Sequence, residues 1–328
     1  MRMNRRSGGP AAPASRIRDA LAPVRHPAVA GTFYPADAGE LGALVDGQLG
    51  AARPPDEALA AAIAGLAGIL VPHAGLVYSG RVAAVAWQLL ASIPPGPEPT
   101  AEGNGAGLWG STTIVMLGTN HGAGWLDGVG TWDAGAWRTP LGDVEVDEDL
   151  AAAIVALGSP FLVDRDAHRS EHSLEVQLPF LSRALPGARI VPLAIGTGTG
   201  QSAHRAGNRL GSLLAERRRR GAQITLAIST DMAHYPPAAV GTWVTRELAP
   251  LILALEPTRL ARREAEIALS GLTGLACGMC GIEPTVVGLA ALRAMGVRRG
   301  IGLAAATSAD AGGSSGRTVG YLAAGFPG

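Results

Sequence analysis

Short apolar runs alternate with segments of helical periodicity along most of the chain. The runs of strand length are 68–72, 112–117, 189–195, 223–229, 301–306 and 319–323. Apolar residues recur at helical spacing over 81–91, 147–157, 174–185, 203–220, 240–255, 259–269 and 283–295. Buried strands that alternate with amphipathic helices predict an α/β layered fold, with a central mixed, largely parallel sheet flanked by helices.

Three residues mark the expected starts of helices. Asp147 is the predicted N-cap of the 147–157 helix, since a side-chain oxygen there can accept a free backbone N–H. Pro179 should either bend the 174–185 helix or mark its true start. Ser170 is a further candidate N-cap, because Glu171 follows it as in the first turn of a helix.

One domain is expected over residues 23–328. Residues 1–22 are rich in Gly, Pro, Ser and Arg, which predicts a disordered tail, and the Pro/Gly-rich segment 93–110 predicts a surface insertion. The N-terminal arginines have no apolar segment behind them, and no apolar stretch is long enough to span a bilayer. We therefore expect no contact with a membrane.

The composition excludes several kinds of chemistry. The 27 basic side chains are all arginine and balance 27 acidic ones, so lysine-based Schiff-base and phosphate-loop mechanisms are excluded. Zero formal net charge argues against nucleic-acid binding, and the arginine run 217–220 suits the last turn of a helix. Two cysteines do not form a disulfide framework, so a cytoplasmic location is expected.

Three of the seven histidines follow predicted strands by a few residues. His73, His121 and His234 come after 68–72, 112–117 and 223–229, where α/β sheets bind their ligands. Two neutral imidazoles with one anionic ligand form the facial arrangement of non-haem iron sites. From spacing alone, the anionic ligand is Asp231, Glu283 or a cysteine thiolate.

A series of separate motifs resembles the Memo-like family, known in bacteria as AmmeMemoRadiSam system protein B. The motifs occur in the family's order from about residue 25 to the C-terminus. They are 30–35 (AGTFYP), 72–75 (PHAG), 78–80 (YSG), 118–121 (GTNH), 137–142 (WRTPLG), 171–175 (EHSLE), 229–231 (STD) with His234, and 280–281 (CG). The resemblance implies a fold similar to that of the class III extradiol dioxygenases.

The same resemblance implies a metal site. The metal ligands of the family correspond to His73, His121 and Cys280, which would hold one iron(II) or copper ion per chain, with no nucleotide cofactor. A thiolate in place of the dioxygenases' carboxylate is a softer ligand and favours thiophilic metals such as copper(I). It also weakens the expectation of ring cleavage.

The resemblance further implies acid–base roles for Asp231 and His234, and a site-lining hydroxyl from Tyr78. Two functions follow as hypotheses. The first is a dioxygenase-like oxidoreductase that carries out an oxygen-dependent redox reaction. The second is a non-catalytic adaptor whose vestigial cleft binds a peptide or another partner. The ligand, a small molecule or a peptide, is unknown, and the family's group name suggests a radical-SAM partner protein.

Other motifs have simpler interpretations. Cys277 forms a C-x-x-C pair with Cys280, but one such pair does not make a zinc site, and we interpret Cys277 as an incidental neighbour. His168, Glu171 and His172 match the inverted zinc-peptidase pattern, which requires a single helix; a helix start at Ser170 would leave His168 outside it. His172 is nevertheless expected near the cleft.

The remaining candidates are structural. Glu283 at a helix start is best explained as a partner of the helix dipole. Trp132 and Trp137 lie in a hairpin-like stretch before Thr139 and Pro140, and they are expected to pack against the core; the alternative is that they line the cleft. The glycines of 196–200 lack the dinucleotide-binding spacing and predict a turn before a helix.

Overall fold

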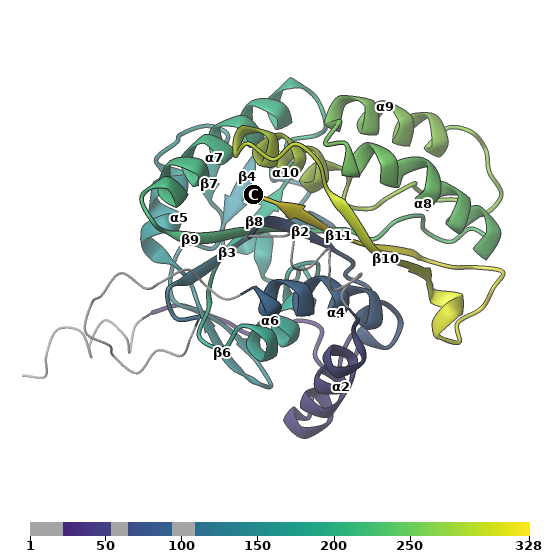
Figure 1. Cartoon of the computed structure of the whole chain (residues 1–328), viewed down its shortest axis with the longest axis horizontal. Coiled ribbons are helices and arrows are strands. Elements are labelled where there is room, and N and C mark those ends of the chain that lie inside the picture. The colour runs from purple at the N-terminus through teal and green to yellow at the C-terminus, as the bar shows by residue number, and fades with distance from the viewer. Residues whose placement is uncertain (1–21, 54–64, 94–108) are drawn as a thin grey trace, which may run out of the picture.

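The computed structural model describes residues 22–53, 65–93 and 109–328, which form a layered α/β structure (Figure 1). The strands of its main sheet are β2 (Leu66–Val71), β3 (Thr112–Thr119), β4 (Val129–Thr131), β7 (Phe161–Val163), β8 (Arg189–Ile195), β9 (Gln223–Ser229), β10 (Ile301–Thr307) and β11 (Gly320–Pro327). Their order is β10-β11-β2-β9-β3-β8-β4-β7.

The centre of this sheet is parallel and its edges are mixed. β2, β9, β3 and β8 run parallel to one another. β11 is antiparallel to β2 and to β10, and β4 is antiparallel to β8 but parallel to β7. The predicted fold class, a mixed and largely parallel sheet flanked by helices, is confirmed.

Helices cover both faces of the sheet (Figure 1). The helices on one face are α7 (Gln201–Arg219), α8 (Ala238–Leu253), α9 (Pro257–Ala268) and α10 (Ile282–Ala294). Those on the other face are α2 (Ala38–Ala51), α4 (Leu76–Ser92) and α6 (Leu178–Ala184), and α5 (Glu148–Val155) packs near β7 and β8. Short 3₁₀ helices are η1 (Asp166–His168), η2 (Glu175–Gln177) and η3 (Ser308–Ala311).

Coverage on both faces explains why the central strands are continuously apolar. Every residue of β2 and β3 is buried. Burial of each large aliphatic side chain contributes about 1.5–3 kcal/mol to the stability of the fold. A strand with one face exposed to solvent would instead show apolar and polar residues in alternation. Close contact between α7 and α10 depends on Gly207, because a Cβ there would overlap the carbonyl oxygen of Val287.

A second, three-stranded sheet consists of β1 (Val24–Arg25), β5 (Ala136–Thr139) and β6 (Gly142–Glu145). β1 is parallel to β5, and β5 is antiparallel to β6. The sequence indicated only a hairpin-like stretch before Thr139 and Pro140, where β5 and β6 form a hairpin. It predicted neither β1, which is too short to show a period, nor α2. β1 matters for the site because it buries the side chain of Arg25.

Two of the three expected helix starts are confirmed, and the third is wrong. Asp147 caps α5, since its side chain accepts the N–H of Leu150 at 3.1 Å. Pro179 lies in the first turn of α6 and marks its start. Ser170 caps no helix, because the chain from 170 to 174 has no regular structure and the Glu171 carboxylate binds another segment.

Two expectations fall on other parts of the chain. Apart from their boundary residues, the predicted tail 1–22 and insertion 93–110 lie outside the described residues. Within the described ranges, no helix has the length and apolar character needed to cross a membrane.

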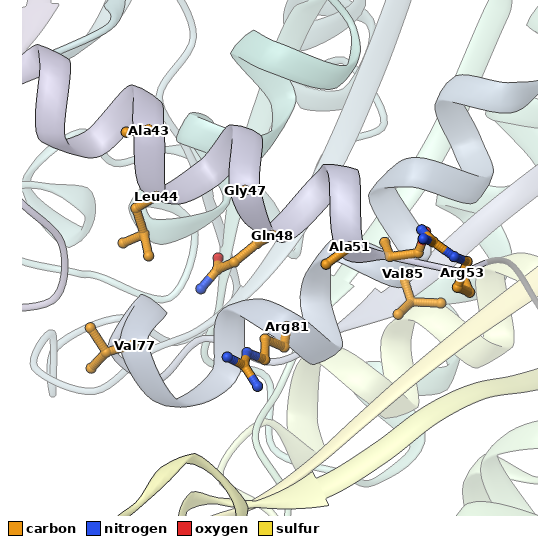
Figure 2. Close-up of a pocket in the computed structure, with 10 residues that line it drawn as sticks. Ala43, Leu44, Gly47, Gln48, Ala51, Arg53, Val77, Arg81 and Val85 are labelled. Atoms are coloured by element: carbon orange, nitrogen blue, oxygen red, sulfur yellow. The ribbon is translucent and has the colours of Figure 1, made fainter.

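A groove with a volume of about 630 Å³ lies between α2 and α4. Figure 2 shows Gln48 and Leu44 of α2 on one side and Val77 and Arg81 of α4 on the other. The described residues that line it include no imidazole, thiol or carboxylate, so they offer no ligand set for a metal.

Candidate metal centre

The three central strands deliver polar residues to one edge of the sheet. β2, β9 and β3 are adjacent and parallel, and Val71 of β2 pairs with Ser229 of β9. His73, Asp231 and His121 each lie two residues beyond the carboxyl end of their strand. The chain topology therefore gathers residues that are far apart in sequence.

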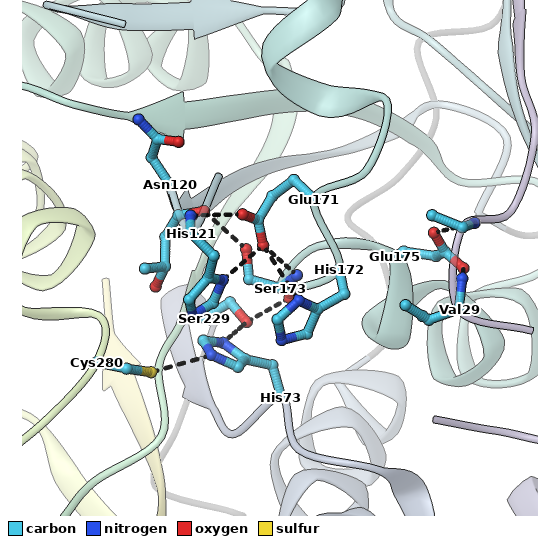
Figure 3. A network of polar contacts seen from close by, with 12 residues as sticks. Val29, His73, Asn120, His121, Glu171, His172, Ser173, Glu175, Ser229 and Cys280 are labelled. Atoms are coloured by element: carbon cyan, nitrogen blue, oxygen red, sulfur yellow. Dashed lines mark hydrogen bonds and ion pairs between the residues drawn. The ribbon is translucent and has the colours of Figure 1, made fainter. Parts of the chain in front are cut away.

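The first group of candidate ligands consists of His73, Asp231 and Cys280, whose ligand atoms lie within 4.8 Å of one another. The Nε2 atom of His73 is 3.0 Å from the Sγ atom of Cys280 (Figure 3). Asp231 Oδ1 accepts the backbone N–H groups of His73 and Ala74, at 2.7 and 3.2 Å. Cys280 is fixed in turn, because its N–H donates to the carbonyl of Asp231 at 3.2 Å.

The hydrogen bonds of Ser229 determine the tautomer of His73. The Ser229 hydroxyl donates to the carbonyl of Ser173 at 2.6 Å and lies 3.0 Å from His73 Nδ1. Since its proton is already used, the hydroxyl must accept from an Nδ1–H. The lone pair of His73 is therefore on Nε2, which faces Cys280.

The second group joins His73 to His121 and His172, again with ligand atoms within 4.8 Å. The rings of His121 and His172 are stacked, with centroids 4.5 Å apart and planes 17° apart. The ring of His73 meets both edge-on, at 5.4 and 5.6 Å. His73 is the member that both groups share, and the predicted ligand set combines it with His121 from one group and Cys280 from the other.

Glu171 holds His121 in place (Figure 3). Its carboxylate accepts the backbone N–H of His121 at 2.7 Å and lies 2.9 Å from His121 Nδ1, so Nδ1 carries the proton and Nε2 is free. It also accepts the N–H of Ser173 at 2.8 Å. Burial alone would raise the pKa of Glu171, but these hydrogen bonds and the nearby imidazole lower it to about 2. Such a carboxylate–histidine pair is the usual support of a metal-bound imidazole.

A buried ion pair anchors the segment that carries Glu171 and His172. Arg25 lies 2.5 Å from Glu175, and its guanidinium also donates to the carbonyls of His168 and Glu171, at 2.9 and 2.7 Å. Glu175 accepts in addition the hydroxyl of Tyr34 at 2.6 Å. Because each charged group makes several hydrogen bonds, the pair fixes this segment against the N-terminal strand.

Asp231 and His234 are the predicted acid–base pair. His234 Nε2 is 3.9 Å from Asp231 Oδ2 and has no hydrogen-bond partner among the described residues. Burial lowers the pKa of His234 to about 4, so the imidazole is neutral near pH 7 and the contact is no ion pair. Burial also raises the pKa of Asp231 to about 7, against the opposing effect of the N–H groups that it accepts.

The other predicted site residue, Tyr78, lies in the first turn of α4, after the His73 loop, with 44% of its surface exposed. Neither Cys277 nor Glu283 belongs to the two ligand groups found among the described residues. The backbone carbonyl of Cys277 accepts the N–H of His234 at 3.1 Å, so the main chain at this position, and not the thiol, contacts the His234 loop.

The structure supports the structural interpretations of the zinc-peptidase pattern, the two tryptophans and the arginine run. His168 lies in η1, is fully buried and hydrogen-bonds to the carbonyl of Gly130 through Nε2 at 2.9 Å, whereas His172 faces the cluster. No single helix carries both, so the zinc-peptidase pattern is not formed. Trp132 and Trp137 are buried in the core. Arginines 217–219 lie in the last turn of α7.

The donor set fits a metal ion. Burial lowers the pKa of His73 well below its usual range and raises that of Cys280 well above its own, so both are neutral without a cation. The thiol proton then lies between Sγ and Nε2, where a metal would replace it. Nitrogen and sulfur donors together are typical of iron, copper and zinc and atypical of magnesium or calcium.

The family model and the relatives that match this chain point to the same family. The family model described as Memo-like protein matches residues 25–325. A MEMO1 family protein of Methanopyrus kandleri is 35% identical over 304 residues, which is 91% of this chain and 97% of that relative. MEMO1 family proteins of Aquifex aeolicus and Ignicoccus hospitalis are each 34% identical, over 91% and 93% of this chain and 97% and 99% of their own lengths. This chain therefore belongs to the Memo-like family.

Proposed function

We propose that the protein binds one iron or copper ion through His73, His121 and Cys280 and uses it in an oxygen-dependent redox reaction. The contact of 3.0 Å between His73 Nε2 and Cys280 Sγ carries this proposal, because it joins two ligand atoms at a buried point next to His121. Asp231 and His172 belong to the same two groups and offer further ligand atoms.

A bound iron or copper ion would supply redox chemistry and Lewis acidity at this point. The protein's own part is orientation. Ser229 and Glu171 accept the Nδ1–H groups of His73 and His121, which directs both Nε2 lone pairs away from these partners and leaves them free to bind. Fixed tautomers and ring planes raise metal affinity because little freedom is lost on binding.

His234 is the proposed proton acceptor. Its imidazole is neutral near pH 7, and its Nε2 atom has no hydrogen-bond partner among the described residues, so a lone pair is available to accept a proton. Once protonated, the ring would be stabilised by the Asp231 carboxylate, whose Oδ2 is 3.9 Å away. His234 is thus poised to remove a proton from a substrate and return it to a product.

The metal content of anaerobically purified protein tests the ligand set. We expect about one iron or copper ion per chain in wild type, and a loss of most of it in His121→Ala. The matched control is His204→Ala, which removes a histidine of α7 that contacts Thr258 at 3.3 Å. Full metal retention in His121→Ala would contradict the ligand set.

The rate of oxygen consumption with catechols or thiols tests the reaction. His234→Ala should keep its metal and lose about 100-fold or more in rate, because a general base contributes about 100-fold at the lower end of its usual range. Equal rates in wild type and variant would contradict the proposed reaction and favour a non-catalytic adaptor.

A further inference from the structure

A separate cavity of about 240 Å³ adjoins Cys280. Thr119 and Asn120, which follow β3, form one part of its wall, and Cys280 with the first turn of α10 forms another. Leu126 and Ile195 contribute apolar surface. At about 30 Å³ per water molecule, the volume suits a small molecule rather than a folded partner.

The cavity carries a negative charge without a counterion. Among the described residues that line it, Glu283 is the one charged side chain. Burial raises the pKa of Glu283, against the effect of the Gly198 N–H, and no cation of the described chain is paired with it. A half-buried carboxylate without a cation has lost hydration and gains from a cationic ligand.

The other polar side chains of the cavity are already engaged in contacts within the protein. Asn120 uses both ends of its amide on the backbone of Ala123, since Oδ1 accepts the N–H at 2.7 Å and Nδ2 donates to the carbonyl at 2.8 Å. Thr119 Oγ1 is buried and lies near the thiol of Cys280. Glu283 is therefore the side chain that distinguishes ligands by charge.

We propose that this cavity is the substrate pocket of the candidate metal centre, and that Glu283 binds the protonated amine of a small substrate whose other end reaches the Cys280 side of the centre. As a substrate assignment, this rests on the proposed function. An anionic end would meet the Glu283 carboxylate directly, so the pocket selects against acids.

Charged thiol reagents measure the preference without any metal. In metal-free Cys277→Ser protein, Cys280 is the only thiol, because the sequence has two cysteines. Its thiolate attacks 2-aminoethyl or 2-sulfonatoethyl methanethiosulfonate, which forms a mixed disulfide and releases methanesulfinate. Mass spectrometry gives each rate, and the same protein unfolded in urea gives the intrinsic ratio of the two reagents.

We expect the cationic reagent to be favoured at least tenfold beyond the intrinsic ratio, and Glu283→Gln to reduce this preference several-fold. Glu266→Gln, an exposed change on α9, should leave the preference unaltered. An unchanged preference in Glu283→Gln would overturn the proposal, and so would a Cys280 that reacts with neither reagent. If the preference depends on Glu283 but the protein binds no metal, the charge preference stands and the proposed function fails.

Discussion

Glu171→Gln is the perturbation that probes the support of His121 most sharply. The carboxylate accepts three N–H groups, two from His121 and one from Ser173, at 2.7–2.9 Å. Glutamine has nearly the same shape but only one oxygen, so its NH₂ group must face at least one of these donors. The change removes a charge and a hydrogen bond and leaves the space filled.

The structure gives the size of the effect on stability. A hydrogen bond to a charged group contributes about 1.5–3 kcal/mol. The fall in the Glu171 pKa from 4.5 to about 2 corresponds to at most about 3.5 kcal/mol, at about 1.4 kcal/mol per unit. Since the folded-state pKa is depressed, this stabilisation is complete above pH 4.5 and is lost as the pH falls toward 2.

Two measurements check the prediction. Urea unfolding should show Glu171→Gln about 2–3 kcal/mol less stable at pH 7, with a difference that shrinks below pH 4.5. Anaerobic titration against a competing chelator should show a 10–100-fold weaker affinity for iron or copper. Asp147→Asn is the control, because Asp147 is a buried carboxylate near Thr113, at the opposite end of β3. A metal affinity in folded Glu171→Gln within twofold of wild type would refute the reasoning.

Three further outcomes are expected. Arg25→Met should lower the free energy of unfolding by about 3–5 kcal/mol in urea, because it leaves the Glu175 charge buried and unpaired; a loss below 1 kcal/mol would contradict this. Gly118→Ala should cost about 1–3 kcal/mol in the same assay, because its Cβ would lie 2.6 Å from Leu174 Cγ; unchanged stability would show that the core yields there. Burial raises the pKa of Cys280, so metal binding must displace the thiol proton. The metal affinity of wild type should therefore rise by about tenfold per pH unit between pH 6 and 8, and that of Cys280→Ser should rise less steeply. Equal slopes of affinity against pH in a chelator titration of the two proteins would exclude a thiol ligand.

Much of the sheet was predictable because its central strands are buried on both faces. The expected strands 189–195 and 223–229 coincide with β8 and β9. The helix α2 was not predicted, because its alanines and glycines show little periodic contrast. Asp37, whose side chain accepts the N–H of Glu40 at 2.9 Å, is the capping signal that marks its start in the structure.

The candidate site was predictable only in part. His73 and His121 are visible in the sequence, because each follows an apolar strand and parallel strands end at one edge. The roles of Glu171 and Ser229 were not predicted. Glu171 lies in a segment without regular structure that the Arg25 ion pair holds, so no local pattern reveals what it touches. Ser229 sets the tautomer of His73 through the hydrogen bond that its hydroxyl donates to the carbonyl of Ser173, a contact that forms only in the folded chain.

The central claim is that His73, His121 and Cys280 bind one metal ion. X-ray absorption spectroscopy at the metal edge, on anaerobically purified protein, tests it most directly. We predict scattering from one sulfur and from imidazole nitrogens in wild type, no sulfur scattering in Cys280→Ser, and an unchanged spectrum in Cys277→Ser. A wild-type spectrum without sulfur, or sulfur scattering that disappears in Cys277→Ser and persists in Cys280→Ser, would contradict the account.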